Sequence, residues 1–148
     1  MSNAYKIHKQ EATYYLTFHV VYWIDVFTRE RYRVIMADSM NHCISQKGLN
    51  IFAYVIMSNH VHLIANATNG NLSNVVGAMK QYTSTQIIES IQSESESRRE
   101  WMLPLFRAAA SHHKRNDTHQ LWTHENHAVE IYSPFLLCSA SHIYATTP

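Results

Sequence analysis

The chain has 148 residues, of which 46% are hydrophobic and 11% aromatic, and its formal net charge is +1. This length suits one domain with its own hydrophobic core, so we expect a single domain over residues 1–148. Only three glycines and three prolines occur, which excludes a collagen-like or disordered chain. The small net charge excludes binding of nucleic acid through overall charge alone.

The sequence also has the features expected of a protein in a reducing compartment. Cys43 and Cys138 lie far apart, in neither a C-x-x-C pair nor a disulfide framework. No apolar run approaches the roughly 20 residues that cross a bilayer, and the N-terminus lacks the layout of a secretion signal. We therefore expect a cytoplasmic protein.

The beginning of the chain predicts a strand followed by a helix. Residues 13–24, TYYLTFHVVYWI, combine aromatic and β-branched side chains, which suit a half-buried strand. Apolar residues then recur every three or four positions over residues 29–47, as in an amphipathic helix. Thr28 is the expected N-cap of this helix, and Gly48 is the residue expected just past its end.

A hairpin and a second helix are expected next. Residues 51–65, IFAYVIMSNHVHLIA, form two short apolar runs joined at Met57-Ser58-Asn59, which predicts two paired strands. A helical pattern then runs from Leu72 to about Ser93. The polar stretch 93–97, SESES, ends it.

The rest of the chain predicts one more helix and short strands. Residues 98–110 look helical, although Pro104 limits the expected start of this helix to near that position. Short strands are expected at 120–123 and 128–132, and a last helical turn or two at 133–137. The order of these elements predicts an α+β fold, a ferredoxin-like split βαβ with an antiparallel central sheet and helices packed on it.

His60 and His62 stand at the start of the second hairpin strand. Because side chains in a strand alternate between faces, both imidazoles are expected to project from the same side of the sheet. Two nitrogen donors on one rigid surface supply half of a site for a divalent metal ion. Spacing alone leaves open the alternative that they are two half-exposed polar residues of an ordinary strand.

Residues 54–64, YVIMSNHVHLI, resemble the signature of the IS200-like transposases, and in particular of the REP-associated tyrosine transposases. The family run is close to Y-V-x-M-P-N-H-x-H-L-L, and Ser58 stands where proline is usual. Further segments agree with the family in order and spacing: Thr17-Phe18, Asn71-Leu72-Ser73 with Met79-Lys80, and Leu121-Trp122 with Glu125-Asn126-His127.

The resemblance implies a one-tyrosine nuclease of the HUH type, named for its His-hydrophobic-His metal site. His60 and His62 would hold Mg²⁺ or Mn²⁺ together with a polar side chain from a late helix. A tyrosine hydroxyl would attack the scissile phosphate of single-stranded or hairpin DNA and form a 5′-phosphotyrosine link, as in DNA transposition and recombination by a mobile element. Relatives include swapped dimers and monomers, so a homodimer is one of two states left open.

The expected nucleophile is Tyr144, because the family carries its tyrosine on the last helix with a polar metal ligand four residues later. Here the fourth residue after Tyr144 is Pro148, so this motif is degenerate. Matching Pro148 to the family proline instead places Ile143 on the tyrosine position and Thr147 on the ligand position. Neither alignment restores both roles.

A second tyrosine has the required spacing on another helix. Tyr82 is followed four residues later by Gln86, so one helical turn separates them. The family does not place its nucleophile on that helix, and Tyr82 is therefore the alternative to Tyr144. Gln86 and Thr147 are the two alternatives for the third metal ligand.

Basic and aromatic side chains supply the expected DNA contacts. Single-strand binders stack bases on aromatic rings and neutralise phosphates with cations. The stacking candidates are Tyr22, Trp23 and Trp122, and the phosphate-binding candidates are Arg98, Arg99, Arg107, Lys114 and Arg115. Each has an ordinary alternative, because exposed cations are usually solvated and tryptophans usually belong to the core.

Three functions stay open at this level. The first is a transposase-like enzyme that cleaves and rejoins DNA. The degenerate end of the chain favours a second, a catalytically impaired domesticated relative that only binds hairpin or single-stranded DNA. The third is a small metal-binding domain without a role on DNA.

Overall fold

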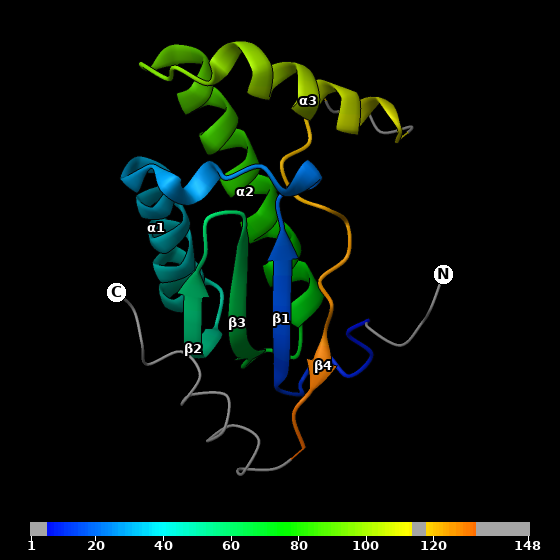
Figure 1. Ribbon diagram of the computed structural model, residues 1–148. Helices are drawn as coiled ribbons and strands as arrows, with labels where there is room; N and C mark the ends of the chain where they lie inside the picture. Colours follow the sequence, from blue (N-terminus) through cyan, green and yellow to red (C-terminus); the bar gives the residue numbers. More distant parts are fainter. Residues whose placement is uncertain (1–5, 114–117, 133–148) are drawn as a thin grey trace.

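The structure, a computed structural model, describes residues 6–113 and 118–132. It contains an antiparallel sheet in the order β2-β3-β1-β4, the arrangement of a ferredoxin-like split βαβ fold (Figure 1). The predicted α+β fold is therefore confirmed. The strands are β1 (Tyr14–His19), β2 (Leu49–Ile56), β3 (His60–Ala67) and β4 (Val129–Glu130), and the helices are α1 (Glu30–Gln46), α2 (Leu72–Ser93) and α3 (Arg99–Ser111).

Helices α1 and α2 cover one face of the sheet and lie behind the strands in Figure 1. Phe18 of β1 and Val61 and Leu63 of β3 point toward these helices and belong to the hydrophobic core. Because side chains alternate along a strand, His60 and His62 point to the opposite face, which we call the open face. Burial of the apolar residues on one side thus fixes which residues the open face presents.

The helices agree with the sequence pattern except at the starts of α1 and α3. Gly48 follows α1 with φ 69°, the left-handed conformation that glycine adopts most readily. Thr28 is not the N-cap, contrary to the prediction, because Arg29 occupies that position. The Thr28 hydroxyl instead donates to the carbonyl of Asp25 at 3.0 Å, a local bond that competes with capping. Within the described residues, no helix has the length and apolar character to span a membrane.

Pro104 does not mark the start of α3, which begins earlier, at Arg99. A proline inside a helix removes a backbone hydrogen bond and costs about 3 kcal/mol. Met102, Leu103 and Phe106 of α3 are buried, and each such side chain contributes about 1.5–3 kcal/mol. Burial of this helical face therefore outweighs the proline.

The first strand is shorter than predicted and ends at His19. Two short 3₁₀ turns follow, η2 (Val21–Trp23) and η3 (Val26–Thr28). The φ angles of Tyr22 and Trp23 are 54° and 56°, a left-handed conformation that cannot continue a pleated strand. The composition of this segment suits a strand, but its backbone turns.

The short strands predicted after residue 118 are only partly present. Residues 120–123 form a single bridge, between Val20 and Trp122, instead of a strand. The strand predicted at 128–132 is reduced to β4. The helical turns predicted at 133–137 lie outside the described residues.

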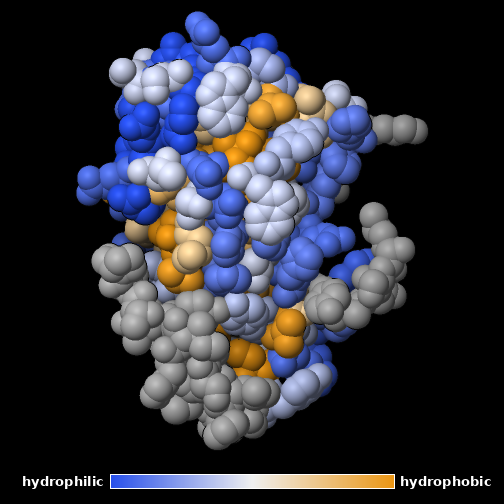
Figure 2. Space-filling view, in the orientation of Figure 1, coloured by the Kyte–Doolittle hydropathy of each residue, from blue (hydrophilic) through white to orange (hydrophobic). Residues whose placement is uncertain are grey.

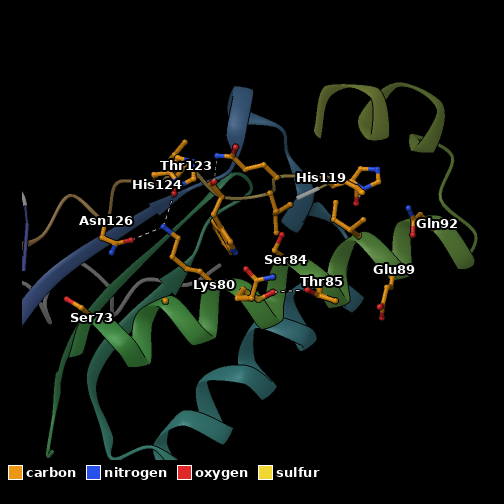
Figure 3. Close-up of a pocket in the computed structure, with 17 residues that line it drawn as sticks. Ser73, Lys80, Ser84, Thr85, Glu89, Gln92, His119, Thr123, His124 and Asn126 are labelled. Atoms are coloured by element: carbon orange, nitrogen blue, oxygen red, sulfur yellow. Dashed lines mark hydrogen bonds between the residues drawn. The ribbon is translucent and has the colours of Figure 1, made fainter. Parts of the chain in front are cut away.

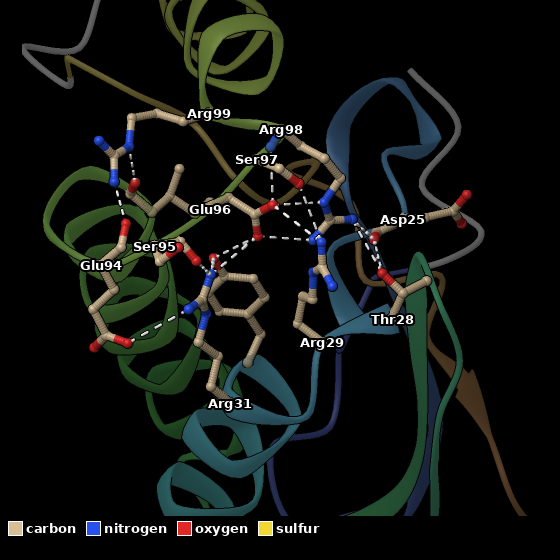
Figure 4. Close-up of polar contacts among 12 residues, drawn as sticks. Asp25, Thr28, Arg29, Arg31, Glu94, Ser95, Glu96, Ser97, Arg98 and Arg99 are labelled. Carbon is tan, nitrogen blue, oxygen red and sulfur yellow. Dashed lines mark hydrogen bonds and ion pairs between the residues drawn. The ribbon is translucent and has the colours of Figure 1, made fainter.

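A buried carboxylate joins the start of α3 to α1 (Figure 4). Glu96, whose side chain is fully buried, accepts hydrogen bonds from Nε of Arg98 and from the hydroxyl of Tyr32, each at 2.9 Å. Arg31 of α1 reaches the same carboxylate at 3.3 Å. The hydrogen bond from Arg98 holds the pKa of Glu96 well below its usual range. The polar stretch 93–97 is thus fixed at one buried residue.

Candidate metal and nucleic-acid site

His60 and His62 lie side by side on the open face. In the register of β1 against β3, His60 stands opposite His19, and His62 stands opposite Thr17. The ring centroids of His60 and His62 are 4.7 Å apart, and those of His60 and His19 are 5.6 Å apart. The sheet therefore gathers three imidazoles where the sequence pointed to two.

The residue before His60 decides which of its nitrogens carries the proton. Nδ1 of His60 lies 2.8 Å from Oδ1 of Asn59, and Nδ2 of the same amide donates to the carbonyl of Trp23 at 3.3 Å. Because the amide oxygen only accepts, Nδ1 carries the proton and Nε2 keeps its lone pair. This is the tautomer that binds a metal ion through Nε2.

Two hydroxyl groups of β1 contact the second imidazole. Nδ1 of His62 lies 2.9 Å from the Tyr15 hydroxyl and 3.1 Å from the Thr17 hydroxyl. The Tyr15 ring also stacks on His62, with ring centroids 5.4 Å apart. When Nδ1 donates to either oxygen, Nε2 of His62 keeps its lone pair. Both members of the pair thus have neighbours that can hold the metal-binding tautomer.

Burial favours the neutral form of these imidazoles. Desolvation lowers the pKa of His62 to about 4, with further contributions from His60 and His19. Burial also lowers the pKa of His60. The pKa of His19 is lowered first by burial and then by the neighbouring imidazoles. A neutral ring is the ligand form, because protonation consumes the lone pair.

A further histidine reaches the site from the segment that runs along the outer edge of β1. His127 has a left-handed backbone, with φ 42°, and its ring centroid lies 5.1 Å from that of His19. The carbonyl of Asn126 accepts a hydrogen bond from the backbone N–H of Thr17 at 2.9 Å. Pairing with β1 therefore places His127 beside the histidines of the sheet.

The same segment forms one wall of a cavity of about 520 Å³, and α2 forms the other wall (Figure 3). Lys80 rises from α2 and donates to the carbonyl of Thr123 and to Oδ1 of Asn126, each at 2.8 Å. Its ammonium lies over the ring of Phe18, on the helix-covered side of the sheet. Desolvation lowers the pKa of Lys80 to about 8. Lys80 thus anchors, from behind the sheet, the segment that carries His127.

The donors of the open face fit part of a divalent metal site. No group of three or more His, Cys, Asp or Glu side chains in the described residues is arranged to hold a metal ion. Nδ1 of His19 is buried and has no hydrogen-bond partner in this part of the chain, so a polar position next to the pair stays unsatisfied. His60 and His62 therefore fit two ligand positions, and other donors would have to complete the shell.

The structure does not bring Tyr82 and Gln86 to the His pair. Both belong to α2, which covers the opposite face of the sheet. Tyr82 is 53% exposed, and Nε2 of Gln86 donates to Glu89 at 3.4 Å. Because the sheet separates them from the pair, a second copy of the chain would have to supply them. Tyr144 and Thr147 lie outside the described residues.

Two of the arginines predicted to bind phosphates have partners inside the protein. Arg98 donates to both carboxylate oxygens of Glu96, at 2.9 and 3.0 Å. Arg99 donates to the carbonyls of Ile91 and Glu94 at the end of α2. Both guanidinium groups therefore secure the turn between α2 and α3.

Of the remaining predicted phosphate-binding residues, only Arg107 lies within the described residues. Arg107 of α3 is exposed, and its Nε lies 3.2 Å from Nε2 of His119. Lys114 and Arg115 lie outside the described residues. Arg107 is thus the exposed member of the predicted set within the described chain.

The three aromatic candidates separate into one buried ring and two exposed rings. Trp122 is 4% exposed, stacks on Phe27 and donates from Nε1 to the Thr83 hydroxyl at 2.9 Å, so the prediction that it stacks on bases is wrong. Tyr22 and Trp23 are 52% and 59% exposed. Of the three candidates, only Tyr22 and Trp23 of η2 have rings exposed for stacking on bases.

Several residues around the His pair have no predicted role from the sequence. Asn59 is part of the quoted motif, and its position directly before His60 was the available signal. Tyr15, Thr17 and His19 alternate along the first strand, which marks one shared face. Their contact with the pair depends on the register of β1 against β3, which no local pattern encodes.

The chain is similar to known proteins in sequence and in fold. Residues 8–120 match the model of the family described as transposase IS200 like. A structure of a REP-associated tyrosine transposase bound to a REP hairpin aligns with a TM-score of 0.61 and 12% identity, covering 97% of this chain and 70% of that chain. A proposed transposase from Deinococcus radiodurans R1 aligns with a TM-score of 0.54 and 18% identity, covering 97% and 95%. No curated protein matches the sequence.

Proposed function

Because the chain belongs to the IS200-like transposase family, we propose that it cleaves and rejoins single-stranded DNA with a divalent metal ion at His60 and His62. One observation carries the proposal: two imidazoles stand 4.7 Å apart on a single strand. Burial lowers the pKa of both, and neighbouring side chains can hold each in the tautomer that binds metal. Ordinary exposed strand histidines do not require such support.

The proposed ion is Mg²⁺ or Mn²⁺, and the nitrogen donors suit Mn²⁺ better. Mg²⁺ prefers oxygen ligands, whereas imidazole is a softer donor. Such an ion, when bound, supplies Lewis-acid polarisation of the scissile phosphate. The protein supplies position: β3 fixes both rings on a rigid surface, and Asn59, Tyr15 and Thr17 orient them.

The proposed reaction transfers a phosphoryl group to tyrosine. The hydroxyl oxygen of Tyr144 attacks the phosphorus and loses its proton, while the bond from phosphorus to the 3′ oxygen breaks and that oxygen takes up a proton. The resulting 5′-phosphotyrosine link stores the phosphodiester bond, so attack by a 3′-hydroxyl can rejoin the strand without ATP. Tyr82 is the alternative nucleophile, supplied from α2 of a second copy of the chain.

Hairpin or single-stranded DNA is the proposed partner. The similar REP-associated transposase is bound to a REP hairpin, which supports this class of substrate. The exposed rings of Tyr22 and Trp23 suit unpaired bases, and the exposed Arg107 suits a phosphate. Lys114 and Arg115 are proposed as further phosphate contacts.

A second candidate function is DNA binding without cleavage. One sequence feature favours it, because Pro148 stands four residues after Tyr144, where the family carries a polar ligand. Proline has no side-chain donor for a metal ion. A relative of this kind would bind hairpin DNA and would form no tyrosine link.

A covalent-adduct assay separates the two candidates. Labelled single-stranded oligonucleotides carrying hairpins are incubated with the protein and Mn²⁺ and then resolved on a denaturing gel. Cleavage predicts a protein–DNA adduct that is lost in His60→Ala and in Tyr144→Phe. His42→Ala is the matched control, because His42 is an exposed histidine of α1 on the covered side of the sheet.

Each other outcome of this assay has a defined meaning. Loss of the adduct in Tyr82→Phe, with Tyr144→Phe still active, moves the nucleophile to α2. Salt-sensitive binding without any adduct supports the second candidate. Absence of DNA binding at low salt contradicts both candidates and leaves a metal-binding domain.

A further inference from the structure

Two consecutive aromatic residues next to the His pair have a disfavoured backbone conformation. Tyr22 has φ 54° and ψ 19°, and Trp23 has φ 56°. The left-handed region is uncommon for residues with a Cβ and is especially disfavoured for bulky ones. Residues held this way persist only where the surrounding structure determines them, and they concentrate at binding and catalytic sites.

Core packing and hydrogen bonds hold this turn in place on both sides. Val21 and Ile24 are buried, at 6% and 5% exposure, so the chain is fixed to the core next to both aromatic residues. The backbone N–H of Val21 donates to the carbonyl of Leu121 at 2.9 Å. Nδ2 of Asn59 donates to the carbonyl of Trp23 at 3.3 Å. The left-handed turn is therefore built into the fold.

The two rings gain little burial from this arrangement, since Tyr22 stays 52% exposed and Trp23 stays 59% exposed. The Trp23 ring nevertheless contacts the imidazoles of the site, with centroids 4.6 Å from His19 and 6.3 Å from His60. Folding alone gives no reason to hold a large ring in solvent on a disfavoured backbone. A ligand that covers the ring would give such a reason.

We infer that Trp23, assisted by Tyr22, is a stacking platform for the unpaired base next to the scissile phosphate at the His pair. The inference rests on the proposed function, and it assigns the neighbouring base to a particular ring. Stacking suits this role because every base has a flat face, so the platform accepts any sequence. Trp122 is excluded by burial, and Trp101 lies on α3, outside the contacts around the imidazoles.

The surface around the platform favours a base over a protein partner. Figure 2 shows this face of the molecule, where the hydrophobic residues in view among those that the structure describes form separate small areas divided by hydrophilic ones. A protein partner usually covers a continuous apolar patch. A base needs one ring face with polar groups nearby, and Trp23 beside His19 and His60 offers that combination.

The test uses a DNA hairpin with an unpaired thymidine flank that carries one 2-aminopurine at successive positions. Stacking on an aromatic ring quenches 2-aminopurine fluorescence, so the wild type should quench one or two adjacent positions. Trp23→Asn removes the ring and keeps a residue that tolerates the left-handed backbone. We expect it to abolish that quenching and to weaken binding about 5- to 150-fold. Trp101→Ala, at a ring that is 49% exposed on α3, should change neither.

Thermal melting of Trp23→Asn shows that the variant is folded, and Trp23→Phe, which keeps an aromatic ring, should retain part of the quenching. Unchanged quenching and affinity in Trp23→Asn would overturn the inference, and so would an equal loss in Trp101→Ala or a wild type that does not bind the probe. The proposed function fails separately: Trp23-dependent quenching without any covalent adduct removes cleavage and keeps the platform. An adduct that depends on His60 but not on Trp23 keeps cleavage and removes the platform.

Discussion

Oδ1 of Asn59 lies 2.8 Å from Nδ1 of His60, so the last residue of the β2–β3 turn leaves the lone pair of His60 on Nε2. The backbone carbonyl of Asn59 also accepts from the N–H of Val20 at 2.9 Å, and its side chain holds the carbonyl of Trp23. One asparagine therefore connects the His pair to the turn that presents the exposed aromatic rings. Both halves of the proposed DNA site depend on it.

Asn59→Ala should free the His60 ring to change tautomer. Loss of a hydrogen-bond partner behind a metal-binding histidine typically costs 10- to 100-fold in metal affinity, so we expect Mn²⁺ affinity to fall by about tenfold. Nitrogen chemical shifts of the His60 ring should show a mixture of tautomers in the variant and one tautomer in the wild type. Asn50→Ala, whose amide bonds Asn66 and Thr68 on the sheet, should leave the affinity unchanged. A single His60 tautomer in Asn59→Ala would contradict this account.

Tyr15 and Thr17 should support His62 redundantly, because both hydroxyl groups lie within hydrogen-bond distance of the same nitrogen. Tyr15→Phe and Thr17→Val should each lower Mn²⁺ affinity by only about two- to threefold, since one hydroxyl remains. The double variant should lower it by 10- to 100-fold, more than the product of the single effects. Calorimetric titration of the four proteins measures this. Strictly additive effects would show that the two hydroxyls act independently of each other, which would contradict the predicted redundancy.

Glu96→Gln should destabilise the protein by about 3 kcal/mol at pH 7, because it leaves the buried end of Arg98 without its charged partner. The pKa of Glu96 is lowered, chiefly by the hydrogen bond from Arg98. Its contribution to stability is therefore present above the ordinary value of 4.5 and is lost as the pH falls toward the folded-state value. Urea unfolding from pH 7 to pH 3 should show a steeper loss in the wild type than in the variant.

Glu94→Gln is the matched control for this prediction. Glu94 lies 3.6 Å from Arg31, but its side chain is 58% exposed, so the pair contributes less than about 1 kcal/mol. The control should unfold almost like the wild type at every pH. Equal destabilisation by the two substitutions would mean that the burial of Glu96 has no special role.

Lys80→Met should change how stability depends on pH in the alkaline range. Desolvation lowers the pKa of Lys80 to about 8, so the folded chain binds fewer protons than the unfolded chain between that value and the ordinary 10.5. Stability of the wild type should therefore rise with pH across this window relative to the variant, by up to about 3 kcal/mol. Parallel stability curves for the wild type and Lys80→Met would contradict the lowered pKa of Lys80. Lys47→Met, at an exposed lysine, is the control.

The same substitution tests whether Lys80 anchors the segment that carries His127. Its ammonium donates to Thr123 and Asn126, and the carbonyl of Asn126 accepts from the N–H of Thr17. Hydrogen exchange at the Thr17 amide should accelerate in Lys80→Met and stay unchanged in Lys47→Met. Unchanged exchange in both would show that pairing with β1 holds the segment without the lysine.

The sequence was informative where a single element decides the outcome. The period-two pattern of β3 placed His60 and His62 on one face, because alternation is a property of any strand. Gly48 ended α1 for an equally local reason, since it adopts the left-handed conformation just past the helix. The apolar spacing from Leu72 to Ser93 matched α2 because its buried residues follow the helical period.

What the sequence could not show depends on contacts between distant segments. The pairing of His19 with His60 follows from the register of β1 against β3. The sequence of either strand does not indicate which residues of the other strand it pairs with. Within the run SESES, only the fold shows that Glu96 is the residue buried among arginines. The composition around Tyr22 and Trp23 favours a strand. The hydrogen bond from Asn59 to Trp23 and the packing of neighbouring residues in the core override that preference.

Binding of Mn²⁺ to the purified chain tests the central claim most directly, because it asks whether the His pair is a metal site without requiring DNA. Titration followed by electron paramagnetic resonance should show one site in the wild type, lost or weakened by at least about 100-fold in His60→Ala and in His62→Ala. His42→Ala should bind like the wild type. Unchanged Mn²⁺ binding in both variants of the pair would remove the metal from the open face and, with it, the proposed nuclease activity.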